Sequence, residues 1–106
     1  WVRFGPSEGG EPDDLRPAVV VSRDEFNASA ALTVTVVPGT RTDRGLRHHL
    51  RVTGPASRGG LPHATYLQPE LMTATAKARL VRRIGRLDRG QQGELDMLLL
   101  SYLDLV

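Results

Sequence analysis

One arginine of this sequence stands where a fixed positive charge can meet a phosphate. Arg16 precedes Pro17, and an apolar run, AVVVS, follows at residues 18–22. Proline restrains the residue before it to extended backbone, so the guanidinium is held at the entrance of a short strand. Arginine stays charged at any working pH and can bind two phosphate oxygens at once. The same charge can also simply pair with Asp13 or Asp14, and the residues alone leave both interpretations open.

The charge distribution favours a polyanionic partner. The 106 residues carry a formal net charge of +2. Acidic residues predominate in 1–15 and 90–106, whereas Arg and Lys outnumber them in 41–89. A basic block between acidic ends is typical of a nucleic-acid surface, although a solvated arginine-rich surface gives the same pattern. Arg41, Arg44 and Arg47 fall in one predicted loop, where they can hold a single strand of RNA and stack on its bases.

The histidines suggest proton transfer, because imidazoles titrate near neutral pH. His48 and His49 are adjacent, and adjacent residues of a strand point to opposite faces, so at most one should face a cleft. We expect His48 or His49 to contact RNA and His63, in a Gly/Pro-rich loop, to be structural. Without cysteine, and with no zinc motif in the histidine spacing, no metal or other cofactor is expected.

Length and composition indicate one domain over residues 1–106, small enough for a dimer interface to help stabilise it. The absence of cysteine favours a reducing cytoplasm. No apolar run is long enough for a membrane span, and no signal peptide is evident, so we expect a soluble cytoplasmic protein. The chain opens on Trp1 rather than Met, and we expect its first strand to be trimmed.

Turn residues and hydrophobic alternation divide the chain into short strands and one helix. We expect strands over residues 1–5, 17–22, 32–40, 48–53 and 64–70, the last interrupted at Pro69. Residues 6–16 and 54–63 are expected to be loops, and 23–31 a turn-like segment. For 72–87 we expect a strand, a tight helical turn and a second strand from Val81 to Leu87.

The C-terminus predicts an amphipathic helix. Asp88 can cap it with Gln91 three residues on. Apolar side chains at helical spacing follow: Leu95, Leu98, Leu99, Tyr102, Leu103 and Val106. The fold expected from these elements is a mainly β domain, a strongly bent antiparallel sheet or partial barrel with a helical lid.

Several segments occur in an order that matches one known family. FGP at residues 4–6 is followed by GEPDDLRPAVVVS at 10–22, DEFN at 24–27 and TVTVVPGT at 33–40. KARLVRRIGRL at 77–87 then precedes the terminal helix. Over nearly the whole chain this order resembles the MazF/PemK family of toxin endoribonucleases. The resemblance implies a small SH3-like antiparallel β-barrel with a C-terminal helix, a homodimer, metal-independent cleavage of single-stranded RNA, and inhibition by a cognate MazE-like antitoxin.

The resemblance also implies site residues. Arg16 matches the arginine of the family's Arg-Pro pair, and Thr40 matches the hydroxyl residue that ends its VVP-x-T strand. Glu70 is a weaker match to an acidic residue in a late strand. We expect these three to be catalytic. The expected RNA-binding residues are Arg41, Arg44, Arg47, His48 and Gln68.

Departures from the family pattern keep other functions open. Gln68, Leu71 and Thr73 stand where some relatives carry Arg, Gln and Arg. A CcdB-like toxin that poisons gyrase by binding it, or a degenerate homologue that binds only antitoxin, would share the fold. The pair Arg16 and Thr40 favours the nuclease. The acidic residues 7–14 are expected to form a mobile flap over the site, since they would repel RNA if fixed there.

Overall fold

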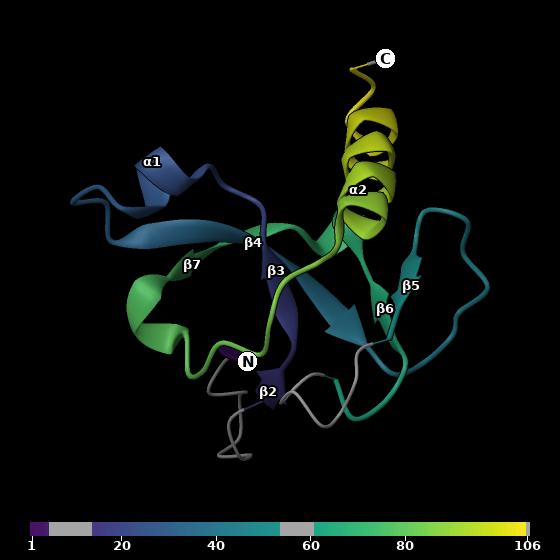
Figure 1. Cartoon of the computed structure of the whole chain (residues 1–106), viewed down its shortest axis with the longest axis horizontal. Coiled ribbons are helices and arrows are strands. Elements are labelled where there is room, and N and C mark those ends of the chain that lie inside the picture. The colour runs from purple at the N-terminus through teal and green to yellow at the C-terminus, as the bar shows by residue number, and fades with distance from the viewer. Residues whose placement is uncertain (5–13, 54–60, 106) are drawn as a thin grey trace.

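The longest strand, β4 (Thr33–Thr40), organises the sheet of the computed structural model, which describes residues 1–4, 14–53 and 61–105. Its β-branched residues favour extended backbone, and Val36 and Val37 are completely buried. One edge of β4 pairs antiparallel with β3 (Ala18–Val20). β6 (Thr65–Leu67) and β7 (Thr73–Ala76) pair with its two ends. β4 therefore pairs directly with β3, β6 and β7, and β5 joins this five-stranded sheet through β6 (Figure 1).

The sheet bends where the chain passes from β6 to β7. The 3-10 turn η2 (Pro69–Leu71) separates these two strands, because Pro69 has no backbone N–H to continue a ladder. β5 (Leu50–Val52) pairs with β6 and forms the far edge. The interruption expected at Pro69 is confirmed, and so is a mainly β fold with a curled antiparallel sheet.

A second, two-stranded sheet joins β1 (Val2–Phe4) and β2 (Asp14–Arg16), with Val2 opposite Arg16. β2 lies in a segment that we expected to be loop, and its pairing with β1 supplies the order that local composition does not. Most of the expected flap, residues 7–13, lies outside the described residues. So do residues 54–60 of the expected second loop.

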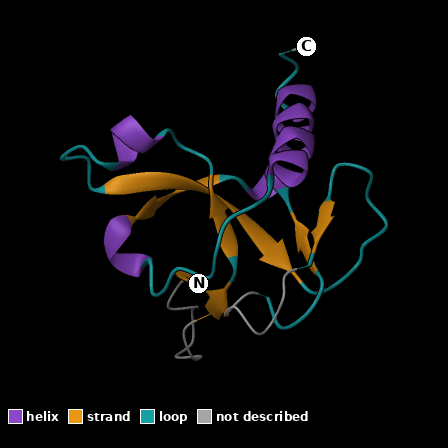
Figure 2. Ribbon diagram, viewed as in Figure 1, coloured by secondary structure: helices purple, strands orange, loops and turns teal. Residues whose placement is uncertain are grey.

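The helix α2 (Arg89–Tyr102) begins as expected. Asp88 accepts a hydrogen bond from the Gln91 backbone N–H at 2.8 Å, and the Gln91 side chain accepts from the Asp88 N–H at 3.0 Å. Leu95 packs into the main core with Val37, Leu50, Val52 and Leu67. Figure 2 shows α2 as the long helix beside the sheet. None of the helices in the described ranges has the length and apolar character needed to cross a membrane.

The predicted strand from Val81 to Leu87 is wrong. After η3 (Lys77–Arg79), Leu80 makes a single bridge to Val2, and the Val81 N–H donates to the Trp1 carbonyl at 2.8 Å. Residues 81–88 then run to α2 without strand structure. β-branched and apolar residues do not make a strand where no sheet edge pairs with them. A short helix, α1 (Asp24–Asn27), forms within the segment expected to be turn-like.

Candidate active site

Arg16 and Thr40 line one cavity of about 490 Å³. Arg16 ends β2, and Thr40 ends β4. The two meet because the Gly39 N–H donates to the Pro17 carbonyl at 2.9 Å, which continues the β3–β4 pairing by one step. The residues next to this bond, Arg16 before Pro17 and Thr40 after Gly39, therefore lie side by side at the end of β4. The structure thus brings Arg16 and Thr40 together, and their action at one site remains a prediction.

Gly39 makes this close approach possible. It is buried, and a Cβ atom there would collide with the Thr65 Cγ2 methyl and lie 3.5 Å from the Pro17 carbonyl oxygen. Its backbone angles do not lie in the left-handed region, so space rather than conformation requires glycine here. The Pro-Gly-Thr sequence thus closes β4 against both neighbouring strands and delivers Thr40 to the cavity.

The Thr40 side chain is oriented by the chain that follows it. Its Oγ1 accepts a hydrogen bond from the Thr42 N–H at 3.2 Å. A hydroxyl that accepts in this way can still donate its own proton. Thr40 is thereby suited to donate a hydrogen bond to an anionic ligand in the cavity, and Arg16 to bind the same ligand by charge.

His63 also lines this cavity, as do Arg41 and Thr42. We expected His63 to be structural, and the Gly/Pro-rich sequence around it gave no other signal. Thr40 pairs with Tyr66, so the chain that enters β6 runs beside the chain that leaves β4. This strand register, which is not visible in the sequence, brings an imidazole to the same cavity as Arg16.

Glu70 lies elsewhere. It belongs to η2, is absent from the described lining of the Arg16 cavity, and contacts both adjacent histidines. Its Oε2 lies 3.0 Å from His48 Nε2 and 2.7 Å from His49 Nε2, and its Oε1 lies 3.0 Å from His49 Nε2. The expectation that the two imidazoles point to opposite faces is wrong, although neither of them is among the described residues that line the Arg16 cavity. Both precede β5, and His48 is in a turn rather than a strand, so side chains need not alternate between faces.

The surroundings of Glu70 favour its ionised form. Burial raises the pKa of Glu70, but hydrogen bonds from His49 and His48 outweigh this and bring the pKa below its ordinary value. The His49 side chain is only 2% exposed, and that of His48 is 38% exposed. The His48 ring also stacks on Tyr102 of α2, with ring centroids 6.4 Å apart.

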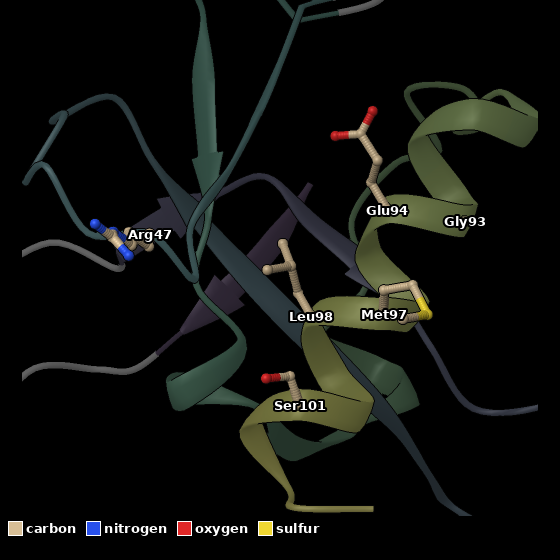
Figure 3. A pocket seen from close by; sticks show the side chains of 6 residues that line it. All are labelled: Arg47, Gly93, Glu94, Met97, Leu98 and Ser101. Atoms are coloured by element: carbon tan, nitrogen blue, oxygen red, sulfur yellow. The ribbon is translucent and has the colours of Figure 1, made fainter. Parts of the chain in front are cut away.

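The remaining predicted RNA-binding residues are spread over the surface and the core. Arg41 lines the cavity of Arg16, and Arg44 is exposed. Arg47 lines a different cavity, of about 550 Å³, along one face of α2. Figure 3 shows Arg47 on the loop, apart from Met97, Leu98 and Ser101 on the helix. Gln68 is 5% exposed, so its side chain is not presented to solvent.

Comparison with known proteins agrees with this architecture and motif order. The family model described as "PemK-like, MazF-like toxin of type II toxin-antitoxin system" matches residues 1–103. The chain belongs to the PemK/MazF toxin family.

Individual MazF proteins are similar over almost the whole chain. Endoribonuclease MazF9 of Mycobacterium tuberculosis is 36% identical over 108 residues, covering 98% of this chain and 91% of that protein. Endoribonuclease MazF6 of the same species is 29% identical over 105 residues, covering 99% and 92%. The similarity to these MazF proteins therefore spans nearly the full length of both chains.

Solved structures show the same fold. The M. tuberculosis toxin MazF-mt6 superposes with a TM-score of 0.73 at 26% identity, over 84% of this chain and 86% of that one. A MazF chain crystallised with MazE from Deinococcus radiodurans gives a TM-score of 0.78 over 100% and 91%, at 22% identity. The curled sheet with its C-terminal helix is the MazF fold.

Proposed function

We propose that this protein is the toxin of a type II toxin–antitoxin system and an endoribonuclease that cleaves single-stranded RNA at specific sequences without a metal ion. The observation that carries the proposal is the shared cavity of Arg16 and Thr40. Membership of the MazF family and similarity to proteins named endoribonucleases support it. Cleavage of mRNA by such an enzyme would stop translation and growth.

The cavity fits cleavage by the neighbouring 2′-hydroxyl of the RNA. The 2′-oxygen bonds to phosphorus as its proton leaves, the bond from phosphorus to the 5′-oxygen breaks, and that oxygen takes up a proton. The products are a 2′,3′-cyclic phosphate and a 5′-hydroxyl end. Arg16 would stabilise the extra negative charge of the pentacoordinate phosphorane, and Thr40 would donate a hydrogen bond to a phosphate oxygen.

His63 gives this proposal a group for proton transfer. Among the described residues that line the cavity, it carries the imidazole, the side chain that most often serves as a general acid or base. Arg41, which lines the same cavity, would bind the backbone phosphate next to the scissile one. Arg44 would add positive charge along the exposed loop for the RNA backbone to follow. Glu70, expected to be catalytic, would not contact the scissile phosphate bound there, because it lies with the histidine pair.

The same proposal includes partners. Type II toxins are paired with protein antitoxins, and an acidic, apolar antitoxin segment would complement the basic surface. Large apolar side chains remain exposed on the described surface, among them Leu32, Met97 and Leu105. A homodimer would cover part of this area. Action on mRNA would place the protein in the cytoplasm.

The test is incubation of antitoxin-free protein with a long unstructured RNA in EDTA, with the new ends mapped by primer extension. Arg16→Ala should lower the cleavage rate roughly 100-fold to 1,000-fold, as for other single transition-state contacts. Arg23→Ala is the matched control, because Arg23 is 83% exposed, pairs with Glu25 and does not line the cavity. Discrete cuts with 5′-hydroxyl ends, lost only in Arg16→Ala, support the proposal. A well-folded wild type that does not cut, or an Arg16→Ala variant that cuts normally, refutes it and makes gyrase poisoning or antitoxin binding the next function to assay.

A further inference from the structure

Three side chains able to ligate metals converge away from the Arg16 cavity. His48, His49 and Glu70 each offer a ligand atom, and these atoms lie within 4.8 Å of one another. Both imidazole Nε2 atoms approach the same carboxylate oxygen, at 3.0 and 2.7 Å. We propose that this cluster, the His48–His49–Glu70 site, binds one divalent transition-metal ion such as Zn²⁺. The proposal does not depend on RNA cleavage.

The distances are close to those of a metal site. In a tetrahedral zinc site the ligand atoms lie about 2.0–2.2 Å from the metal and therefore roughly 3.3–3.5 Å from one another. To reach this spacing, the contacts of 3.0 and 2.7 Å to Glu70 Oε2 need to lengthen by roughly 0.3–0.8 Å, and any pair near the 4.8 Å limit of the cluster needs to shorten. Without metal, an imidazole N–H directed at Glu70 occupies the direction in which a metal would bind, and metal binding at Nε2 would move that proton to Nδ1.

A pair of unsatisfied buried atoms strengthens the inference. In the described part of the chain, His49 Nδ1 and Gln68 Oε1 are both buried without a hydrogen-bond partner. Leu50 pairs with Leu67 at the end of the β5–β6 ladder, and extending this register by one residue places His49 opposite Gln68. These two orphan atoms therefore belong to neighbouring residues.

Metal binding would allow each of these atoms to become the partner of the other. When a neutral His49 donates its Nε2 proton to Glu70, Nδ1 has only a lone pair, as does the Gln68 oxygen. When Nε2 binds a metal, the proton resides on Nδ1 and Gln68 Oε1 can accept it. Ligating histidines usually donate their second N–H in this way, which fixes the ring and its tautomer.

The ligand set defines the class of metal. Two imidazoles and one carboxylate suit Zn²⁺, Co²⁺, Ni²⁺ or Cu²⁺, whereas Mg²⁺ and Ca²⁺ prefer oxygen ligands alone. Three protein ligands leave a fourth position for water. The half-exposed His48 side chain gives solvent access, and the buried His49 gives rigidity. A bound metal would connect the end of the loop that follows β4 to η2, which lies more than twenty residues further along the chain.

The sequence-based expectation of no metal site rested on histidine spacing and the absence of cysteine. Glu70 is remote in sequence, and two consecutive histidines match no zinc motif. The turn that precedes β5 and the register of β5 with β6 create the proximity instead. Neither feature is visible in the spacing of the histidines.

The experiment titrates untagged protein, stripped with EDTA and then freed of it, with Co²⁺ and with Zn²⁺ against a chromophoric chelator. We expect one ion per chain and the visible absorption of tetrahedral Co²⁺. His48→Ala and Glu70→Gln should each weaken Zn²⁺ binding roughly 10-fold to 100-fold or more, since even loss of an outer-shell partner has such an effect. His63→Ala is the control, because it removes a histidine outside the cluster.

Thermal melting in EDTA establishes that the variants are folded. The proposal fails if wild type binds no Zn²⁺ saturably or if either folded variant binds it with wild-type affinity. It also fails if His63→Ala weakens binding as much as His48→Ala does. The Co²⁺ spectrum of the wild type tests the site independently of any variant.

Discussion

Replacing Gly39 by alanine tests the packing that brings Thr40 to Arg16. A Cβ atom at this position would collide with the Thr65 methyl and lie 3.5 Å from both Leu67 Cδ2 and the Pro17 oxygen. Thr65 is 2% exposed, so its methyl cannot move into solvent. Overpacking of this kind costs about 1–3 kcal/mol, and the lower entropy of an unfolded alanine returns about 0.4–1 kcal/mol. We therefore expect a net loss of about 1–2 kcal/mol in the free energy of unfolding.

The clash can be relieved from the other side. Thr65→Ser removes the colliding methyl and keeps the Oγ, which bonds the His63 carbonyl at 3.3 Å. Alone, Thr65→Ser should lower the free energy of unfolding by about 1 kcal/mol, because it deletes a buried methyl group. In the double variant Gly39→Ala/Thr65→Ser the new methyl fills the space of the lost one. The double variant should therefore lose less free energy of unfolding than the two single variants do together, by about 1 kcal/mol or more.

Urea denaturation at one fixed protein concentration measures all four proteins, since any oligomer links stability to concentration. The single Gly39→Ala variant should also melt roughly 4–16 °C lower than wild type. If the two substitutions add to within about 0.5 kcal/mol, they do not interact. That result would refute the claim that the Thr65 methyl is what excludes a side chain at position 39.

Two further predictions concern the helix cap and the histidine cluster. Asp88→Ala should lower the free energy of unfolding by about 1 kcal/mol, because it removes the bond to the Gln91 N–H. Asp88→Asn should retain most of this free energy in the same denaturation assay. If Asp88→Asn and Asp88→Ala lose the same free energy of unfolding, the capping role is contradicted. In EDTA, wild type should be more stable than Glu70→Gln at neutral pH, because the lowered pKa of Glu70 means that the folded state favours the carboxylate. This difference should shrink as pH falls below the ordinary value of 4.5 and Glu70 takes up its proton; a difference that is constant with pH would contradict it.

Local patterns were sufficient where an element is stabilised by its own residues. The β-branched run of β4 and the capped, periodic α2 both carry their signals within the element. β2 has only three residues in an acidic segment and becomes a strand by pairing with β1. The stretch Val81–Leu87 has the composition of a strand, but among the described residues its pairing is limited to the hydrogen bonds that Val81 and Arg82 make with Trp1. Strand formation depends on an available edge, which local composition does not reveal.

The two groups of site residues differ for the same reason. Arg16 and Thr40 could be paired from the sequence because both belong to motifs that the family resemblance already links. Their proximity depends on the hydrogen bond from the Gly39 N–H to the Pro17 carbonyl, and both of these residues lie within those motifs. Glu70 could be found as a candidate, but its partners could not, because they lie 21 and 22 residues earlier and follow from a strand register.

The error over His48 and His49 came from applying strand alternation one or two residues too early. β5 begins at Leu50, and the backbone before it turns, so neighbouring side chains can approach a single carboxylate. Alternation is a property of extended backbone, and it ends where the ladder ends. The last pair of the ladder, Leu50 with Leu67, still brings the histidines near Gln68 and η2, because these directly follow Leu67. A histidine pair just before a strand should therefore be assessed together with the residues that follow the partner strand, since those are the groups it can reach.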